Sequence, residues 1–284
     1  MKLEGKVAIV AGGGQGIGEG IVKCLAEEGA DVVIVDYDGE NAKQVAEEVK
    51  SMGRKGLGIY ADCADGDLVA KAVQEIMDTF GKMDILVNNV GGHSAQPPRT
   101  EIPTFVDRTE KEWQGYYEQN LKSHIMMSRA VIPHFKEQKS GKIVNISSVS
   151  GRFPDYDKAP YTVFKTSVIS LTWVLARELA EFNINVNCVC PGTVFTPLWR
   201  RGVVAILGRL RQAKAEGTEL PGRYNQFLEL ENLDSITPEE FWPIMMPVHQ
   251  TPEDIGKTVA VFVTEDSKNI TGQTICVDNG MIMR

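Results

Sequence analysis

The sequence predicts an α/β fold in which one mostly parallel sheet of about seven strands is covered by helices on both faces. Two observations carry this prediction. Short apolar runs rich in β-branched residues alternate with longer segments whose apolar residues recur at helical spacing. This alternation repeats as β-α-β units, which build a parallel, doubly wound sheet. With 284 residues and 43% hydrophobic content, the chain can bury such a core.

The apolar runs place the strands, beginning with the β-branched run KVAIVA. They cover residues 6–11, 32–35, 56–61, 84–89, 142–147, 183–190 and 273–277. The helical spacing places the helices at 18–29, 40–52, 66–80, 109–138, 160–182 and 253–264. Three more helices are expected near 198–216, 223–232 and 238–244. The first helix stops at Gly29, a typical C-cap residue. Segment 109–138 holds one long helix or two consecutive ones, with Asn120 in its middle. An asparagine there is neutral to unfavourable for a helix, so Asn120 is expected to have a structural partner or a function.

A glycine-rich loop lies between the first strand and the first helix. Gly12, Gly16 and Gly18 give the spacing G-x-x-x-G-x-G. Glycines let the backbone approach a pyrophosphate closely, and a helix N-terminus offers free N–H groups and a positive dipole end. Such a loop can also be a simple tight turn, but strand, loop and helix in this order are the context that a dinucleotide site requires.

Asp36 ends the second strand, 18 residues after Gly18. A carboxylate at this distance can accept hydrogen bonds from an adenosine ribose, and it would repel a 2′-phosphate. Tyr37 and Asp38, which follow, add no positive charge. The sequence therefore predicts NAD(H) as cofactor in preference to NADP(H). The alternative is that Asp36 only caps the end of the strand.

Tyr161 and Lys165 lie four residues apart in a predicted helix, so their side chains share one face. A neighbouring ammonium favours the phenolate, so we expect the pKa of Tyr161 to fall from about 10 towards the working pH. A tyrosine tuned in this way can exchange a proton with a substrate oxygen. The alternative is an ordinary amphipathic helix that carries one tyrosine and one lysine.

Charge and cysteine content narrow the function classes. The net charge of −8 makes nucleic acid an unexpected partner, because phosphate binding needs a basic footprint. The five cysteines form no C-x-x-C pair or metal-ligand spacing, so no metal is expected and a reducing compartment is favoured. The apolar run Val7–Ala11 is too short for a signal peptide, and no segment has the length of a membrane span. We expect a cytoplasmic protein that does not bind membranes.

Taken together, these features resemble the classical short-chain dehydrogenase/reductase family over nearly the whole chain. The markers are AGGGQGIG (11–18), NNVG (88–91), Asn120 in QNLKS, NISSVSG (145–151), YTVFK (161–165), PGTVFTP (191–197) and VDNG (277–280). Ala11, Val90 and Asn279 depart from the usual Thr, Ala and Gly of the family. The resemblance implies a single Rossmann-like domain over 1–284, with an extended helical substrate lid inserted at about 197–251.

The resemblance also implies the chemistry, namely NAD-dependent interconversion of a secondary alcohol and a ketone. The implied catalytic residues are Asn120, Ser148, Tyr161 and Lys165. Ser148 would bind the substrate oxygen, Tyr161 would be the general acid or base, Lys165 would lower the tyrosine pKa and hold the nicotinamide ribose, and Asn120 would anchor a relay water. Ser148 is favoured over Ser147 because adjacent strand residues point to opposite faces.

Further positions are expected to line the cofactor and the substrate. The cofactor positions are Gly12, Gln15, Gly16, Ile17, Gly18, Asp36, Tyr37, Asp62, Cys63, Asn89, Gly91, Tyr161, Lys165, Pro191, Val194 and Thr196. The substrate positions are His93, Ser148, Phe153, Tyr156 and Trp199. The family also implies a homotetramer or homodimer. Two alternatives stay open: a non-catalytic dinucleotide-binding regulator of the same fold, and an epimerase or dehydratase. Steroids, cyclic alcohols, sugar acids and acyl-thioesters remain open as substrates.

Overall fold

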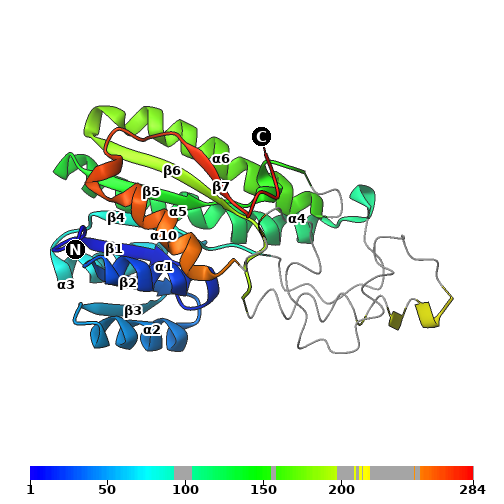
Figure 1. Ribbon diagram of the computed structural model, residues 1–284, viewed down its shortest axis with the longest axis horizontal. Helices are drawn as coiled ribbons and strands as arrows, with labels where there is room; N and C mark the ends of the chain where they lie inside the picture. The colour runs from blue at the N-terminus through cyan, green and yellow to red at the C-terminus, as the bar shows by residue number, and fades with distance from the viewer. Residues whose placement is uncertain are drawn as a thin grey trace.

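The structure is a computed structural model that describes residues 1–92, 104–154, 158–196, 208, 211–212, 214–217, 246 and 250–283. Seven strands form one sheet in the order β3-β2-β1-β4-β5-β6-β7, and every neighbouring pair is parallel (Figure 1). The strands are β1 (Val7–Ala11), β2 (Asp31–Asp36), β3 (Gly56–Tyr60), β4 (Ile85–Asn88), β5 (Gly141–Ile146), β6 (Ile184–Pro191) and β7 (Thr274–Val277). The predicted fold class is therefore confirmed, and each predicted strand is present with ends shifted by one or two residues.

Helices cover both faces of the sheet (Figure 1). One face packs against α1 (Gly16–Glu27), α2 (Gly39–Ser51) and α10 (Pro252–Val263), and the other against α3 (Gly66–Phe80), α5 (Ser123–Gln138) and α6 (Ala159–Leu179). Along β1, Ala8 and Val10 point into the first core, whereas Val7 and Ile9 point into the second. This alternation follows from the two-residue period of a strand, and both faces are apolar because both are covered.

The predicted helical segment 109–138 is two α-helices joined by a π-helical turn. The first, α4 (Glu110–Tyr117), has Thr109 as its N-cap residue, and the Thr109 side chain forms a capping box with Glu112. The π-turn spans Glu118–Lys122 and contains Asn120, and α5 follows it. Asn120 Nδ2 donates to the Tyr116 carbonyl at 3.1 Å. This side chain therefore takes an acceptor of the helix backbone, which is a physical reason for the wider turn.

Most of the expected lid over 197–251, with its three helices, lies outside the described residues. The remaining helix ends agree with the sequence prediction to within a few residues, and α6 is followed by a short 3-10 turn at Ala180–Phe182. Within the described ranges, no helix combines the length and the apolarity needed to cross a membrane.

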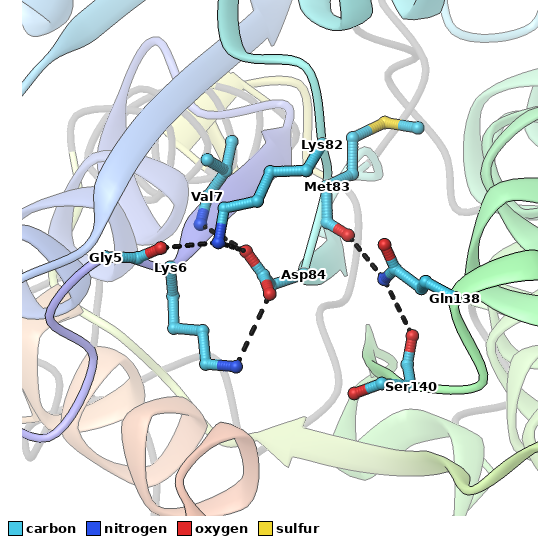
Figure 2. A network of polar contacts seen from close by, with 8 residues as sticks. All are labelled: Gly5, Lys6, Val7, Lys82, Met83, Asp84, Gln138 and Ser140. Carbon is cyan, nitrogen blue, oxygen red and sulfur yellow. Dashed lines mark hydrogen bonds and ion pairs between the residues drawn. The ribbon is translucent and has the colours of Figure 1, made fainter.

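Asp84, the residue before β4, forms hydrogen bonds and ion pairs at the amino-terminal ends of the central strands (Figure 2). Asp84 Oδ2 accepts from the Val7 N–H at 2.9 Å and pairs with Lys82 Nζ at 2.9 Å. Asp84 Oδ1 pairs with Lys6 Nζ at 3.4 Å. Lys82 also donates to the Gly5 carbonyl at 2.6 Å. These contacts lie at the strand ends opposite the glycine loop, so they stabilise the sheet and not the candidate site.

Replacing Asp84 with Ala should lower the free energy of unfolding by about 1–3 kcal/mol, because the N–H of buried Val7 loses its acceptor. Asp84→Asn keeps an acceptor oxygen and removes only the pairs with two partly exposed lysines, so it should cost less than about 1 kcal/mol. Urea unfolding of both variants measures the difference. Equal losses in the two variants would show that the ion pairs, and not the Val7 hydrogen bond, carry the stability.

Candidate active site

The glycine loop between β1 and α1 forms a tight cradle at the carboxyl end of the sheet. Gly12 and Gly16 have φ of 76° and 59°, a region that favours glycine. A Cβ on Gly18 would lie 1.9 Å from the Gly12 carbonyl oxygen, so only glycine fits there. Gln15, the N-cap residue of α1, makes no side-chain capping hydrogen bond to the first turn of this helix. These features fit a pyrophosphate.

Asp36 at the end of β2 is tied to this loop. Its Oδ2 accepts from the Gly14 N–H and its Oδ1 from the Asp38 N–H, both at 2.9 Å. The carboxylate therefore holds the end of β2, which agrees with the alternative that Asp36 caps the strand. It also lies at the rim of the glycine cradle. A shallow depression of about 400 Å³ beside it is lined by Tyr37, Asp38, Gly39, Glu40, Lys43 and Tyr60. Lys43, the cation of that lining, pairs with Glu40 at 2.9 Å.

Other residues that are expected to line the cofactor lie around the same edge. Asn89 Nδ2 donates to the Gly12 carbonyl at 2.7 Å, so this side chain supports the glycine loop. Asp62 is exposed after β3, and its Oδ1 accepts from the Ala64 N–H at 2.8 Å. Cys63 is buried, and burial, with the nearby Asp36 and Asp62 charges, raises the pKa of its thiol to about 12. Only the backbone of Cys63 could therefore meet a ligand.

The two serines after β5 have different environments. Ser147 Oγ donates to the Lys165 carbonyl at 2.7 Å within the core. The Ser148 hydroxyl is hydrogen-bonded to the Tyr161 hydroxyl, and it accepts from the Ser150 N–H at 3.1 Å. The structure thus brings Ser148 together with Tyr161 and leaves Ser147 to hold α6 against the strand.

Lys165 is buried behind Tyr161. Its Nζ donates to the Ile146 carbonyl at 3.0 Å. A Cβ on Gly91 would lie 2.5 Å from that Nζ, so Gly91 provides the space for the ammonium. The next residue, Gly92, exchanges two hydrogen bonds with the Asn120 side chain, at 2.9 and 3.0 Å. Asn120 therefore holds the turn after β4 against Lys165.

The pKa shifts differ from the sequence-based expectation. Burial raises the pKa of Tyr161, and the hydrogen bond from Ser148 opposes this shift. Burial also lowers the pKa of Lys165 to about 8. The expected lowering of the Tyr161 pKa by Lys165 is not found, because the ammonium binds the Ile146 carbonyl and lies 5.8 Å from the centre of the tyrosine ring. The same packing that brings the two groups together buries Lys165 and part of Tyr161, and burial dominates both shifts.

The loop after β6 faces the glycine loop. Thr196 lies across from Gly16, whose added Cβ would be 3.5 Å from the threonine methyl. Val194 is buried in the core that contains α1, so its backbone is the part that could meet a ligand. Pro191 is the last residue of β6. Of the expected substrate residues, Phe153 is exposed, while His93, Tyr156 and Trp199 lie outside the described residues.

The chain matches the family described as short chain dehydrogenase over residues 6–203, more than half of its length. The protein belongs to the short-chain dehydrogenase/reductase family. The candidate catalytic and cofactor-binding residues described above lie within the matched range.

Relatives of this short-chain dehydrogenase/reductase match along nearly their whole length. It is 34% identical to the 3-oxoacyl-(acyl-carrier-protein) reductase FabG of Staphylococcus aureus, covering 98% of each chain. It is 32% identical to the (2S)-((R)-hydroxy(phenyl)methyl)succinyl-CoA dehydrogenase subunit BbsD of Thauera aromatica, covering 99% of this chain and 98% of the relative. Among solved structures, the 3-ketoacyl-(acyl-carrier-protein) reductase from Brucella melitensis complexed with NADH superposes with a TM-score of 0.78 at 30% identity, covering 99% and 100% of the two chains.

The sequence interpretation of this short-chain dehydrogenase/reductase missed three residues. Gly92 was not predicted, although it follows the predicted Gly91, and a pair of glycines after a strand indicates a close approach of the backbone. His124 lies one helical turn after Asn120, so the i,i+4 spacing could have placed it on the same face. It is fully buried, and its Nε2 has no hydrogen-bond partner among the described residues. Gln250 had no local signal.

Burial lowers the pKa of His124 from 6.5 to about 3, and the nearby Lys165 ammonium adds to this shift, while the Ile146 and Asn88 backbones oppose it. His124 thus stays neutral in the native protein while the unfolded chain takes up a proton below its ordinary pKa. The contribution of His124 to the free energy of unfolding therefore decreases as pH falls from about 6.5 towards about 3.

We expect His124→Leu to lose this pH dependence. Between about pH 6 and about pH 4, the stability of the wild type should fall relative to the variant by about 1.4 kcal/mol per pH unit, the value for one proton. Urea unfolding at several pH values measures it. His134→Leu, at a less buried site on the same helix, is the matched control and should keep the wild-type pH dependence. Parallel curves for wild type and His124→Leu would contradict the buried neutral state.

Proposed function

We propose that the protein is an NAD-dependent oxidoreductase that interconverts a secondary alcohol and a ketone. The observation that carries this proposal is the hydrogen-bonded hydroxyl pair of Ser148 and Tyr161 with the buried Lys165 behind it. The N-terminus of α1 and the glycine cradle support a dinucleotide beside this group. Membership of an oxidoreductase family supports the same reaction class.

The bound nicotinamide would supply or accept the hydride, and the protein side chains would handle the proton and the orientation. In reduction, Ser148 and Tyr161 would both bind the carbonyl oxygen, and Tyr161 would donate its proton to it. The raised pKa of Tyr161 keeps the phenol protonated at neutral pH, which suits this role. In oxidation, the hydrogen bond from Ser148 would stabilise the phenolate that accepts the alcohol proton.

Lys165 and Asn120 would support the proton transfer. A lysine with a pKa of about 8 is still mostly an ammonium at neutral pH, so it can donate a hydrogen bond to a ribose hydroxyl of the cofactor. Both N–H groups of the Asn120 amide are already used, by the Gly92 and Tyr116 carbonyls. The relay water that we propose would therefore be bound by oxygen acceptors of Asn120, in its side chain or in the backbone of the π-turn.

The preference for NAD(H) is proposed from Asp36. Its carboxylate lies at the end of β2, and the nearby Lys43 forms an ion pair with Glu40. Asp36→Ala should raise kcat/KM with NADP(H) relative to NAD(H) by at least about tenfold, because a 2′-phosphate would no longer meet a negative charge. Steady-state rates with the two cofactors measure this ratio. A wild type that already prefers NADP(H) would refute the assignment.

The substrate class is best tested with a panel of alcohols and ketones followed by NADH absorbance. The named activities of the relatives make 3-oxoacyl thioesters and hydroxyacyl-CoA compounds the first members to include. A net change in NADH supports dehydrogenation, whereas product formation without one would indicate the epimerase or dehydratase alternative. NAD binding with no turnover on the whole panel would favour a non-catalytic regulator.

Three further properties are proposed together with this activity. The segment at about 197–251 forms the substrate lid of a single domain over 1–284. The chain forms a homotetramer or homodimer through its long helices, which the exposed apolar side chains Val163, Trp173 and Val174 on α6 support. The protein acts in the cytoplasm, which the five free cysteines support. Light scattering of the purified protein tests the assembly.

A further inference from the structure

Phe195 and Gln250 lie on the two sides of the segment 197–249 in the sequence and are hydrogen-bonded to each other. On one side is Phe195, whose N–H donates to the Gln250 carbonyl on the other side at 3.0 Å. The Gln250 side chain is 3% exposed, so its amide is almost fully removed from water. A buried amide is unfavourable unless it is hydrogen-bonded. Gln250 Nε2 donates to the Val277 carbonyl at the end of β7.

The same Val277 carbonyl holds the loop after β6. It also accepts from the Gly192 N–H, at 2.8 Å. A Cβ on Gly192 would lie 3.2 Å from Gln250 Oε1 and 2.8 Å from the Asp278 backbone, so the loop is pressed against both. Gln250 therefore binds the beginning of this loop through Val277 and its later part through Phe195. Gln250 thus fixes the loop 191–196 at two points.

Gln250 also connects this loop to the glycine cradle. The next residue, Thr251, caps α10. Helix α10 packs closely on α1, because a Cβ on Gly256 would lie 2.6 Å from the Gly20 carbonyl oxygen. At the other end, Thr196 lies across from Gly16 at the start of α1. The loop 191–196, Gln250, α10 and α1 thus form a closed ring of contacts beside the site.

The part of the cofactor that this ring would hold follows from the position of the loop. Pro191 ends β6, and the Ser147 N–H donates to the Val189 carbonyl of that strand at 2.8 Å, so the end of β6 lies beside Ser148, the hydrogen-bond partner of Tyr161. The loop therefore starts beside the proposed proton donor, where the reacting ring must lie, and not beside Asp36. We propose that Gln250 is a positioning residue that holds the loop 191–196 against the nicotinamide half of the cofactor. This inference rests on the proposed function.

The test compares the binding of NADH with that of ADP-ribose, which lacks the nicotinamide. By isothermal titration calorimetry, Gln250→Ala should weaken NADH binding about tenfold and leave ADP-ribose binding within about twofold of the wild type. Gln250→Met, which is close in size but removes the donor without adding a charge, should show the same selectivity and serves if the alanine variant does not fold. Gln273→Ala is the matched control, because this exposed glutamine also donates to a backbone carbonyl, Thr271, at 3.1 Å. It should bind both ligands like the wild type.

The outcomes separate this inference from the proposed function. Equal weakening of NADH and ADP-ribose, or unchanged binding of both, would mean that Gln250 has only a structural role and would overturn the inference alone. A wild type that binds neither ligand would overturn the proposed function itself. A larger effect on KM for NADH than on kcat in the Gln250 variants would agree with positioning of the cofactor and not of the proton donor.

Discussion

A Tyr161→Phe variant should bind NADH as tightly as the wild type and lose nearly all turnover. The substitution removes one oxygen, which is hydrogen-bonded to Ser148 and is the proposed proton donor. General acid–base catalysis accelerates reactions by about 10²- to 10⁴-fold, so we expect kcat to decrease by a factor in that range. NADH affinity by titration and turnover by absorbance measure the two properties separately.

The fold should survive this change, since the ring and its packing remain. Tyr60→Phe is the matched control, because this tyrosine is exposed at the end of β3, away from Ser148. The control should keep wild-type turnover. If Tyr161→Phe also kept near-wild-type turnover, Tyr161 would not be the general acid, and the assignment of the whole catalytic group would fail.

The second large effect is expected from Gly91→Ala. The added Cβ would lie 2.5 Å from Lys165 Nζ and 3.1 Å from Asn120 Oδ1. The Nζ is the end of a flexible side chain, so the protein can yield by moving the ammonium rather than the backbone. We therefore expect kcat/KM to fall at least about tenfold, while the free energy of unfolding falls by no more than about 1–3 kcal/mol.

Gly115→Ala is the control for this variant, because a Cβ there meets no described atom within 4 Å. Gly115 lies inside α4, so this control should keep its activity and gain up to about 1 kcal/mol of stability from the better helix propensity of alanine. Steady-state kinetics and urea unfolding of both variants test the pair. Unchanged activity in Gly91→Ala would show that the position of Lys165 does not limit catalysis.

Local patterns were sufficient to predict the architecture. β-Branched runs such as Val32–Val35 can be recognised without tertiary information, because a strand buried on both faces is apolar throughout. The position of Asn120 in the middle of a predicted helix indicated a structural partner or a function, because its side chain competes with the backbone for hydrogen bonds. The spacing of glycines predicted the cradle, where Gly18 lies so close to Gly12 that no Cβ fits.

Long-range contacts explain what local patterns could not predict. The sequence placed Lys165 next to Tyr161, but not the Ile146 carbonyl that binds its ammonium from a different strand. It therefore predicted the wrong direction for the pKa of Tyr161. The pairing of Gly92 with Asn120 joins residues 28 positions apart, and no periodicity encodes it. Gln250 meets Val277 in the same way.

The sequence by itself determined which elements form, their order, and which residue types are available for the chemistry. These properties depend on neighbours within a few positions, where hydrophobic period, glycine spacing and helix geometry act. Only the tertiary structure decided how far each group is removed from water and which carbonyl it meets. Burial depends on all the elements packed around a group, and for Tyr161 and Lys165 it outweighs the charge of the neighbour that the sequence placed beside it.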